Sequence, residues 1–110
     1  MRSLLLCLLC APVIATATPR AKSAEECVAY ADLALVASAM ARNGIAADLA
    51  GKMLPDVYHL TTADARAIAN EILSAAYRKP EQVPREFAMA IGQGCLSNGG
   101  DIGALLGSPA

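Results

Sequence analysis

Apolar residues recur at steps of three and four along residues 27–41, which is the spacing of an α-helix. One stripe consists of Cys27, Tyr30, Ala31, Ala34, Ala37 and Ala41, and an adjoining stripe consists of Leu33, Val36 and Met40. So wide an apolar surface predicts a helix that is buried on most sides. We expect it to begin at a capping box formed by Ser23 and Glu26 and to end at residues 42–44, where Gly44 can adopt a left-handed conformation.

A second helix is expected over residues 45–54, with one apolar side made of Ile45, Leu49, Met53 and Leu54. Pro55 is expected to end this helix, because the residue before a proline disfavours the helical conformation. Residues 56–61 then form a connection.

The clearest amphipathic pattern of the chain follows this connection. Its apolar positions are Ala65, Ile68, Ala69, Ile72, Leu73 and Ala76. Thr61 or Thr62 is placed to cap the helix, Asp64 lies in its first turn, and residues 78–80 end it.

A fourth helix is expected from Pro84, since a proline in the first turn removes no helical hydrogen bond. Phe87, Ile91 and Cys95 lie four residues apart on its buried side, and residues 98–100 end it. No strand-like alternation occurs in the sequence. The patterns therefore predict an all-α fold, a small four-helix bundle over residues 23–100, followed by a glycine-rich tail over residues 101–110. The tail either packs back on the bundle or forms a mobile arm.

The first 17 residues have the layout of a secretory signal peptide. Arg2 is followed by an apolar run of about ten residues, and small residues, Ala15 to Ala17, come at the expected cleavage site. We expect cleavage after Ala17 and a flexible tether over residues 18–22. The apolar run is too short for a stable membrane anchor, and Leu6 and Leu9 before the two leader cysteines do not suit lipidation. The predicted location is the periplasm or the outside of the cell.

Cleavage sorts the four cysteines into two pairs. Cys7 and Cys10 leave with the leader, whereas Cys27 and Cys95 remain in a chain that matures in an oxidising compartment. An even pair in that setting predicts one disulfide. This bond would join the first and last helices of the bundle.

Charge excludes one class of partner. The whole chain has nine basic and ten acidic residues and a net charge of −1. The mature part, with a net charge of about −2, has no concentrated basic face of the kind that phosphate neutralisation requires. A nucleic-acid partner is therefore not expected.

Candidate catalytic groups are sparse. His59 is the single histidine, and it lacks the neighbouring ligands of a zinc site. A Ser-His-Asp triad would combine His59 with Ser38 or Ser74 and with Asp56 or Asp64, but neither serine lies in a nucleophile elbow. The remaining candidates for paired carboxylates are Glu25, Glu26, Asp32, Asp48 and Glu71. Glu25 and Glu26 are explained by the positive end of the helix dipole, and Asp32 by a solvent-facing position. We expect no enzyme, no metal and no cofactor.

A binding role follows by elimination. Two apolar segments are candidates for an interaction surface, the connection with Val57, Tyr58, His59 and Leu60 and the tail with Ile102, Leu105 and Leu106. In layout alone the chain is similar to the helical immunity proteins of type VI secretion amidases, which are small, exported and disulfide-bearing. No motif matches, so no functional residue carries over. The expected role is that of an immunity protein, an inhibitor or an accessory subunit bound to another envelope protein.

Two further expectations concern assembly and function. The layout is also similar to that of acid-activated periplasmic chaperones, although the cysteine spacing differs from that family. In addition, a bundle this small and rich in alanine gains apolar burial by pairing, so a homodimer is a natural outcome.

Overall fold

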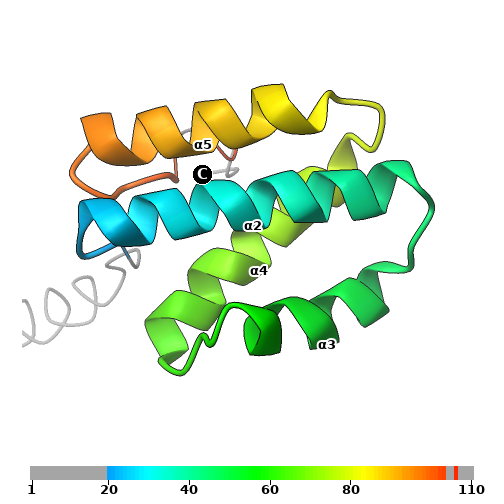
Figure 1. Cartoon of the computed structure of the whole chain (residues 1–110), viewed down its shortest axis with the longest axis horizontal. Coiled ribbons are helices and arrows are strands. Elements are labelled where there is room, and N and C mark those ends of the chain that lie inside the picture. The colour runs from blue at the N-terminus through cyan, green and yellow to red at the C-terminus, as the bar shows by residue number, and fades with distance from the viewer. Residues whose placement is uncertain (1–19, 104–105, 107–110) are drawn as a thin grey trace, which may run out of the picture.

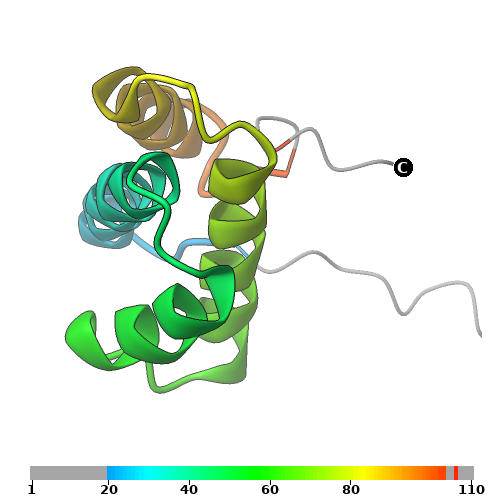
Figure 2. The ribbon, with the colours of Figure 1, turned by 90° about the vertical axis from the view of Figure 1, so that its right-hand side faces the viewer.

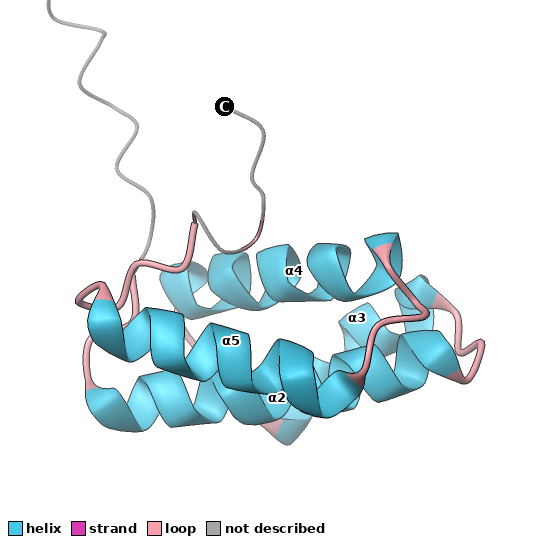
Figure 3. Ribbon diagram, turned by 90° about the horizontal axis from the view of Figure 1, so that it is seen from above, coloured by secondary structure: helices cyan, strands magenta, loops and turns pink. Residues whose placement is uncertain are grey.

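The computed structural model describes residues 20–103 and 106, and it confirms the all-α four-helix fold. The helices are α2 (Ala24–Arg42), α3 (Ala47–Val57), α4 (Ala63–Arg78) and α5 (Pro84–Ser97). They form two layers (Figures 1 and 2). Helices α5, α2 and α3 lie side by side with α2 in the middle, and α4 crosses the back of this layer. Seen from above, α4 lies behind the α2 and α5 pair (Figure 3).

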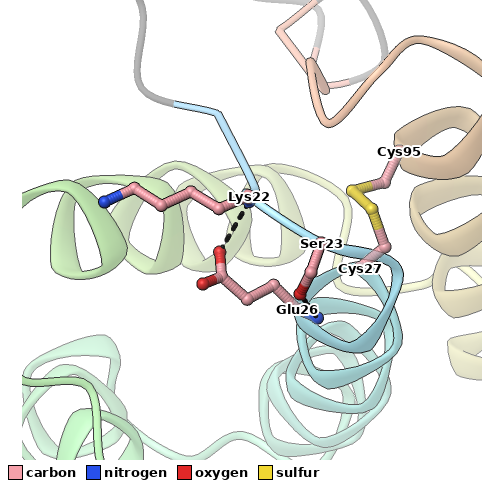
Figure 4. Close-up of a disulfide and its surroundings, with 5 residues drawn as sticks. All are labelled: Lys22, Ser23, Glu26, Cys27 and Cys95. Atoms are coloured by element: carbon pink, nitrogen blue, oxygen red, sulfur yellow. Dashed lines mark hydrogen bonds between the residues drawn. A yellow bond between two sulfur atoms is a disulfide. The ribbon is translucent and has the colours of Figure 1, made fainter.

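Three of the four predicted helix starts are confirmed, whereas α3 begins at Ala47 and not at residue 45. The Ser23 side chain accepts a hydrogen bond from the Glu26 backbone N–H at 3.1 Å, as a capping box requires. The Glu26 carboxylate reaches one residue further back than expected and accepts from the Lys22 N–H at 2.8 Å (Figure 4). Thr62 caps α4 by accepting from the Ala65 N–H at 3.1 Å, and Pro84 opens α5.

Three helices end in the same left-handed cap. After α2 and α5 the residue with positive φ is a glycine, Gly44 at 76° and Gly99 at 63°. After α3 it is His59, at 55°. The Leu60 N–H donates to the Pro55 carbonyl at 2.9 Å and the His59 N–H to the Asp56 carbonyl at 3.3 Å, the two hydrogen bonds of a Schellman motif. The chain therefore reverses direction at His59, although glycine adopts this positive φ with less steric strain.

The end of α3 differs from the sequence-based prediction. The helix passes through Pro55 and ends at Val57, so two residues assigned to the connection, Asp56 and Val57, are helical. A proline near the C-terminus of a helix removes only one backbone hydrogen bond, and the Schellman motif restores the terminal hydrogen bonding beyond it.

Small side chains dominate the centre of the core. Fully buried alanines of three helices, Ala34, Ala37, Ala50 and Ala76, lie among a few large residues. The large buried apolar side chains of the helices are Tyr30, Leu33, Leu54, Ile68, Ile72 and Ile91, and Ile102 and Leu106 join them from the tail. Gly92 of α5 leaves room for Ala31 of α2, because a Cβ at residue 92 would lie 3.1 Å from the Ala31 Cβ. Such residues let the helix axes approach closely.

The predicted disulfide joins Cys27 in the first turn of α2 to Cys95 near the end of α5, with a Cα–Cα distance of 5.6 Å (Figure 4). The cross-link spans 68 residues of sequence and encloses nearly the whole bundle. Both cysteines are buried.

The segments before and after the bundle meet beside this disulfide. The Ala21 N–H donates to the Gly100 carbonyl at 3.0 Å, and Ala21 is buried. Ordered structure therefore begins inside the segment predicted as a flexible tether, of which residues 18 and 19 lie outside the described residues, as does the predicted leader. Of the two alternatives for the tail, packing back is the one observed for Ile102 and Leu106, and the Arg78 guanidinium donates to the Leu106 carbonyl.

Reduction of the disulfide should strongly destabilise the bundle. Closing a loop of this length in the unfolded chain stabilises the native state by about 4 kcal/mol, and the alanine-rich core offers little burial to offset its loss. We expect reductant to lower the melting temperature by about 15 °C or more. A calorimetric or circular dichroism melt with and without reductant measures the change, and equal midpoints would contradict the prediction.

Gly100 should be far less replaceable than its neighbour Gly99. Both have positive φ, but a Cβ at residue 99 meets nothing within 4 Å, whereas a Cβ at residue 100 overlaps the backbone carbonyl of Ala21. We expect Gly99→Ala to cost about 1 kcal/mol of unfolding free energy and Gly100→Ala about 3 kcal/mol or more. Urea unfolding of the two variants compares them directly. Equal losses would show that the contact with Ala21 contributes nothing.

Candidate interaction surface

The residues predicted around the α3–α4 connection have different environments. Val57 is exposed at the end of α3, and His59 is exposed in the left-handed cap. Tyr58 and Leu60 are half-buried and pack against the core. The connection therefore offers single exposed side chains and no continuous apolar loop.

The tail does not supply the predicted surface. Ile102 is 3% exposed and Leu106 is 4% exposed, so both belong to the core, and they are withdrawn as surface candidates. Leu105 lies outside the described residues. Ile102 and Leu106 are buried because the chain turns at Gly99 and Gly100, both with positive φ, and brings these two side chains into the hydrophobic core.

A larger apolar surface lies on the three-helix layer. Helix α2 has α5 on one side, α3 on the other and α4 behind it, so its exposed residues can point only outward (Figure 2). Two of these outward residues are large and apolar, Val28 and Leu35, seven residues apart on one stripe of the helix. We call the outward side of the α5, α2 and α3 layer the outer face.

Helix α5 extends this surface beyond α2. Gly92 contacts Ala31 of α2, which fixes the side of α5 that adjoins α2. Met89 and Leu96 stand three residues before and four residues after Gly92, on the same stripe, and both are exposed. The buried side chains of α5, such as Ile91, point to the other flank. Met89 and Leu96 therefore lie on the outer face next to the α2 stripe.

Helix α3 extends the surface on the other side of α2. Gly51 faces Leu73 of α4, since a Cβ at residue 51 would lie 3.5 Å from that side chain. Leu49, Met53 and Val57 are four residues apart on the side of α3 turned away from α4, and all three are exposed. This is the remaining part of the outer face.

Together these residues account for nearly all of the large apolar side chains that the described structure exposes. Their exposed fractions range from 38% to 62%. The outer face carries seven of them: Val28, Leu35, Leu49, Met53, Val57, Met89 and Leu96. The eighth, Val83, lies in the α4–α5 connection. A clustering of this kind on one side of a small protein marks a contact surface more often than scattered apolar residues do.

One polar contact fixes the border between α2 and α3 on this surface. The Tyr58 hydroxyl donates to the Asp32 carboxylate at 2.6 Å, which ties the end of α3 to the middle of α2. Burial raises the pKa of Tyr58 above its ordinary value, and the hydrogen bond and negative charge of Asp32 raise that pKa further. Asp32, expected to point into solvent, is exposed and also holds this tyrosine.

The candidate catalytic residues do not assemble into a site. Ser38 is fully buried, and its Oγ has no hydrogen-bond partner, so no base contacts it. Ser74 lines an open hollow of about 350 Å³ whose other lining residues include no histidine and no carboxylate. His59 has a backbone role in the cap of α3. Among residues 20–103 and 106, no three His, Cys, Asp or Glu side chains are grouped so that they could hold a metal ion.

The sequence-based interpretation missed most of the outer face. It assigned two wide apolar stripes of α2 to the core and gave no role to Val28 or Leu35, which lie outside both stripes. One available signal was the α3 stripe, where Leu49 and Met53 flank Ala50 and Leu54. A helix of that length cannot bury so wide a stripe against only one or two neighbours.

Comparison with known proteins adds no relative. No protein-family model, no curated protein and no solved structure matches the chain.

Tyr58→Phe should change how stability responds to high pH. Because the folded-state pKa of Tyr58 is raised, its stabilising contribution is complete below the unfolded value of 10.0 and is lost as the pH rises toward the folded-state pKa. The wild type should therefore lose unfolding free energy above about pH 10 more steeply than Tyr58→Phe. The pKa values of Tyr30 and Tyr77 are also raised, so the unfolding free energy of Tyr58→Phe should still fall at high pH, but less steeply than that of the wild type. Urea unfolding between about pH 8 and about pH 11 measures the two slopes, and parallel curves would contradict the assignment.

Proposed function

We propose that this protein is a small exported helical protein that acts by binding another protein of the cell envelope, as an immunity protein, an inhibitor or an accessory subunit. The observation that carries the proposal is the outer face, where seven large apolar side chains gather on three adjacent helices. The periplasm, reached through the predicted leader, is the compartment in which the Cys27–Cys95 disulfide can form.

The composition of the outer face suits a protein partner. Valine, leucine and methionine side chains contribute most of it, and methionine adapts its shape to different partners. The cysteine cross-link and the close contact of Gly92 with Ala31 restrain α2 and α5, which carry four of the seven residues, in the free protein. A rigid surface loses little conformational entropy on binding, which favours affinity.

Within residues 20–103 and 106, no helix has both the length and the apolar composition needed to cross a bilayer. The acid-activated chaperone fits the structure less well than a binding protein. Activation by acid requires many carboxylates whose native contacts are lost on protonation. In the part of the chain that the structure describes, three carboxylates have such contacts: Glu26 with the Lys22 N–H, Asp32 with the Tyr58 hydroxyl, and Asp101 with the Gly103 N–H and, at 3.7 Å, with Arg20.

The proposal predicts that partner binding depends on Leu35, near the middle of the outer face. Affinity capture from the native envelope, followed by mass spectrometry, should recover one stoichiometric partner with the wild type. Leu35→Glu should reduce recovery at least about tenfold, because a buried unpaired charge costs several kcal/mol. Val83→Glu is the matched control, since it places the same charge on an exposed apolar residue away from the outer face.

Equal recovery with Leu35→Glu and with the wild type would place the binding site elsewhere. Recovery of no partner by any form would overturn the proposed function. Circular dichroism of both variants checks that they remain folded, as expected for substitutions at exposed positions.

A further inference from the structure

We infer that the segments before and after the bundle form a clasp that shields the Cys27–Cys95 disulfide from reductants. The clasp consists of residues 20–22 and residues 99–101, which pair beside the disulfide. A dithiol reaches the sulfur atoms when this clasp opens, while the helices stay folded. The inference goes beyond the proposed function and does not depend on it, since no protein partner takes part.

The disulfide borders a surface hollow, yet its cysteines are almost inaccessible. The hollow has a volume of about 260 Å³, and both cysteines contribute to its lining. Cys27 is nevertheless 2% exposed, and Cys95 is 0% exposed. Thiol–disulfide exchange requires a thiolate to reach one of the two sulfur atoms, so this burial blocks the reaction in the closed protein. The clasp contributes four residues to the lining of the hollow: Ala21, Lys22, Gly99 and Gly100.

The two halves of the clasp are in direct contact. The Ala21 N–H donates to the Gly100 carbonyl at 3.0 Å, and a Cβ at residue 100 would overlap the Ala21 carbonyl. Arg20 and Asp101 form an ion pair at 3.7 Å on the solvent side. Figure 4 shows Lys22 and Ser23 beside the disulfide, so the chain enters α2 next to the cross-link. The N-terminal half of the clasp therefore lies where a reductant would have to approach.

The C-terminal half of the clasp is firmly attached to the bundle. The Gly100 N–H donates to the Cys95 carbonyl at 2.8 Å, and the Asp101 N–H donates to the Asn98 carbonyl at 3.2 Å. Ile102, which follows directly, is buried in the core. These contacts hold residues 99–101 in place at the end of α5.

The N-terminal half has fewer contacts. The Lys22 N–H is bound by the Glu26 carboxylate and belongs to the cap of α2. Before Lys22, the hydrogen bond and the ion pair found in the described structure both go to the C-terminal half of the clasp. Exposed ion pairs contribute little, and a chain end held by so few contacts opens far more often than the whole domain unfolds. Residues 20 and 21 are therefore the part that moves, and Lys22 is the hinge.

Opening of the clasp admits a dithiol to the cross-link. One thiolate of the dithiol attacks one sulfur atom of the Cys27–Cys95 bond, the S–S bond breaks, and its electron pair leaves on the other cysteine as a thiolate. The second thiol of the dithiol then attacks the mixed disulfide. The dithiol is thereby oxidised to a disulfide, both cysteines are reduced, and the two protons of the dithiol pass to them. The clasp thus controls the rate at which the bundle loses its cross-link.

Reduction by dithiothreitol under native conditions tests the inference. The chain is expressed with its own leader and purified with the disulfide formed, and free thiols at Cys27 and Cys95 are alkylated and followed by mass spectrometry. Ala21→Pro removes the N–H that donates to Gly100 and should accelerate reduction at least about fivefold. Gly100→Ala forces the two halves apart and should accelerate it at least about tenfold. Gly99→Ala is the matched control and should stay within about threefold of the wild type, because its Cβ meets nothing within 4 Å.

Leu54→Ala distinguishes opening of the clasp from unfolding of the bundle. Leu54 is buried in α3, on the other side of α2 from α5, and its truncation destabilises the whole fold. A reaction that required global unfolding would become about 30-fold faster or more in this variant. Reduction through the clasp should change less than about threefold, and it should respond weakly to urea below the unfolding transition, because the opening exposes little surface.

Three results would overturn the inference. The first is a reduction rate that rises with Leu54→Ala and with urea in proportion to the loss of global stability. The second is equal reduction of the wild type, Ala21→Pro and Gly100→Ala. The third is a disulfide that stays oxidised in both clasp variants until the protein unfolds. Circular dichroism of the oxidised variants establishes that each is folded at the start of the reaction.

Discussion

Helix α2 contacts each of the other three helices, and this arrangement determines most of the structure. With neighbours on both flanks and α4 behind it, α2 needs small side chains where it contacts other helices. Its buried alanines at residues 34, 37 and 41, and Ala31 against Gly92, meet this need. The same arrangement leaves α2 one open side. The disulfide is attached at the first turn of this helix and fixes α5 along it, so two of the three helices that present the outer face are cross-linked.

Large apolar side chains lie on the outer face, whereas small ones fill much of the core. Alanines occupy much of the centre, whereas valine, leucine and methionine side chains stand outside on α2, α3 and α5. Burial of apolar area stabilises a protein in proportion to the area removed from water, about 25 cal/mol per Å². The exposed side chains contribute little to the folded monomer, and their contribution is realised only when another surface covers them. A small core supplemented by a disulfide is consistent with a domain in which part of the apolar surface is kept for association.

The sequence predicts the helices well because the signals at their ends act locally. Ser23 and Thr62 accept hydrogen bonds from backbone N–H groups in the first turns of α2 and α4, and Pro84 has no N–H that needs a partner in the first turn of α5. The glycines after α2 and α5 adopt the left-handed conformation that ends a helix. The disulfide follows from the two cysteines that remain on buried stripes. The extension of α3 beyond Pro55 was not predictable in this way. It depends on a left-handed histidine, a conformation for which the sequence gives no signal as clear as that of glycine. The burial of Ile102 and Leu106 depends on long-range contacts with the bundle, such as the one between Arg78 and the tail.

The candidate surface was harder to predict than the fold for a related physical reason. Helical periodicity identifies which residues are apolar and on which side they lie, but the number of neighbours around a helix decides which sides are covered. In α2, Leu33 is almost completely buried and Leu35 is exposed, although the two leucines occupy similar positions in the same apolar run. The difference follows from the position of α4 behind the layer. An apolar pattern that is too wide for the neighbours available to it therefore predicts exposed apolar side chains, and in this protein α2 and α3 have such patterns and expose Val28, Leu35, Leu49 and Met53.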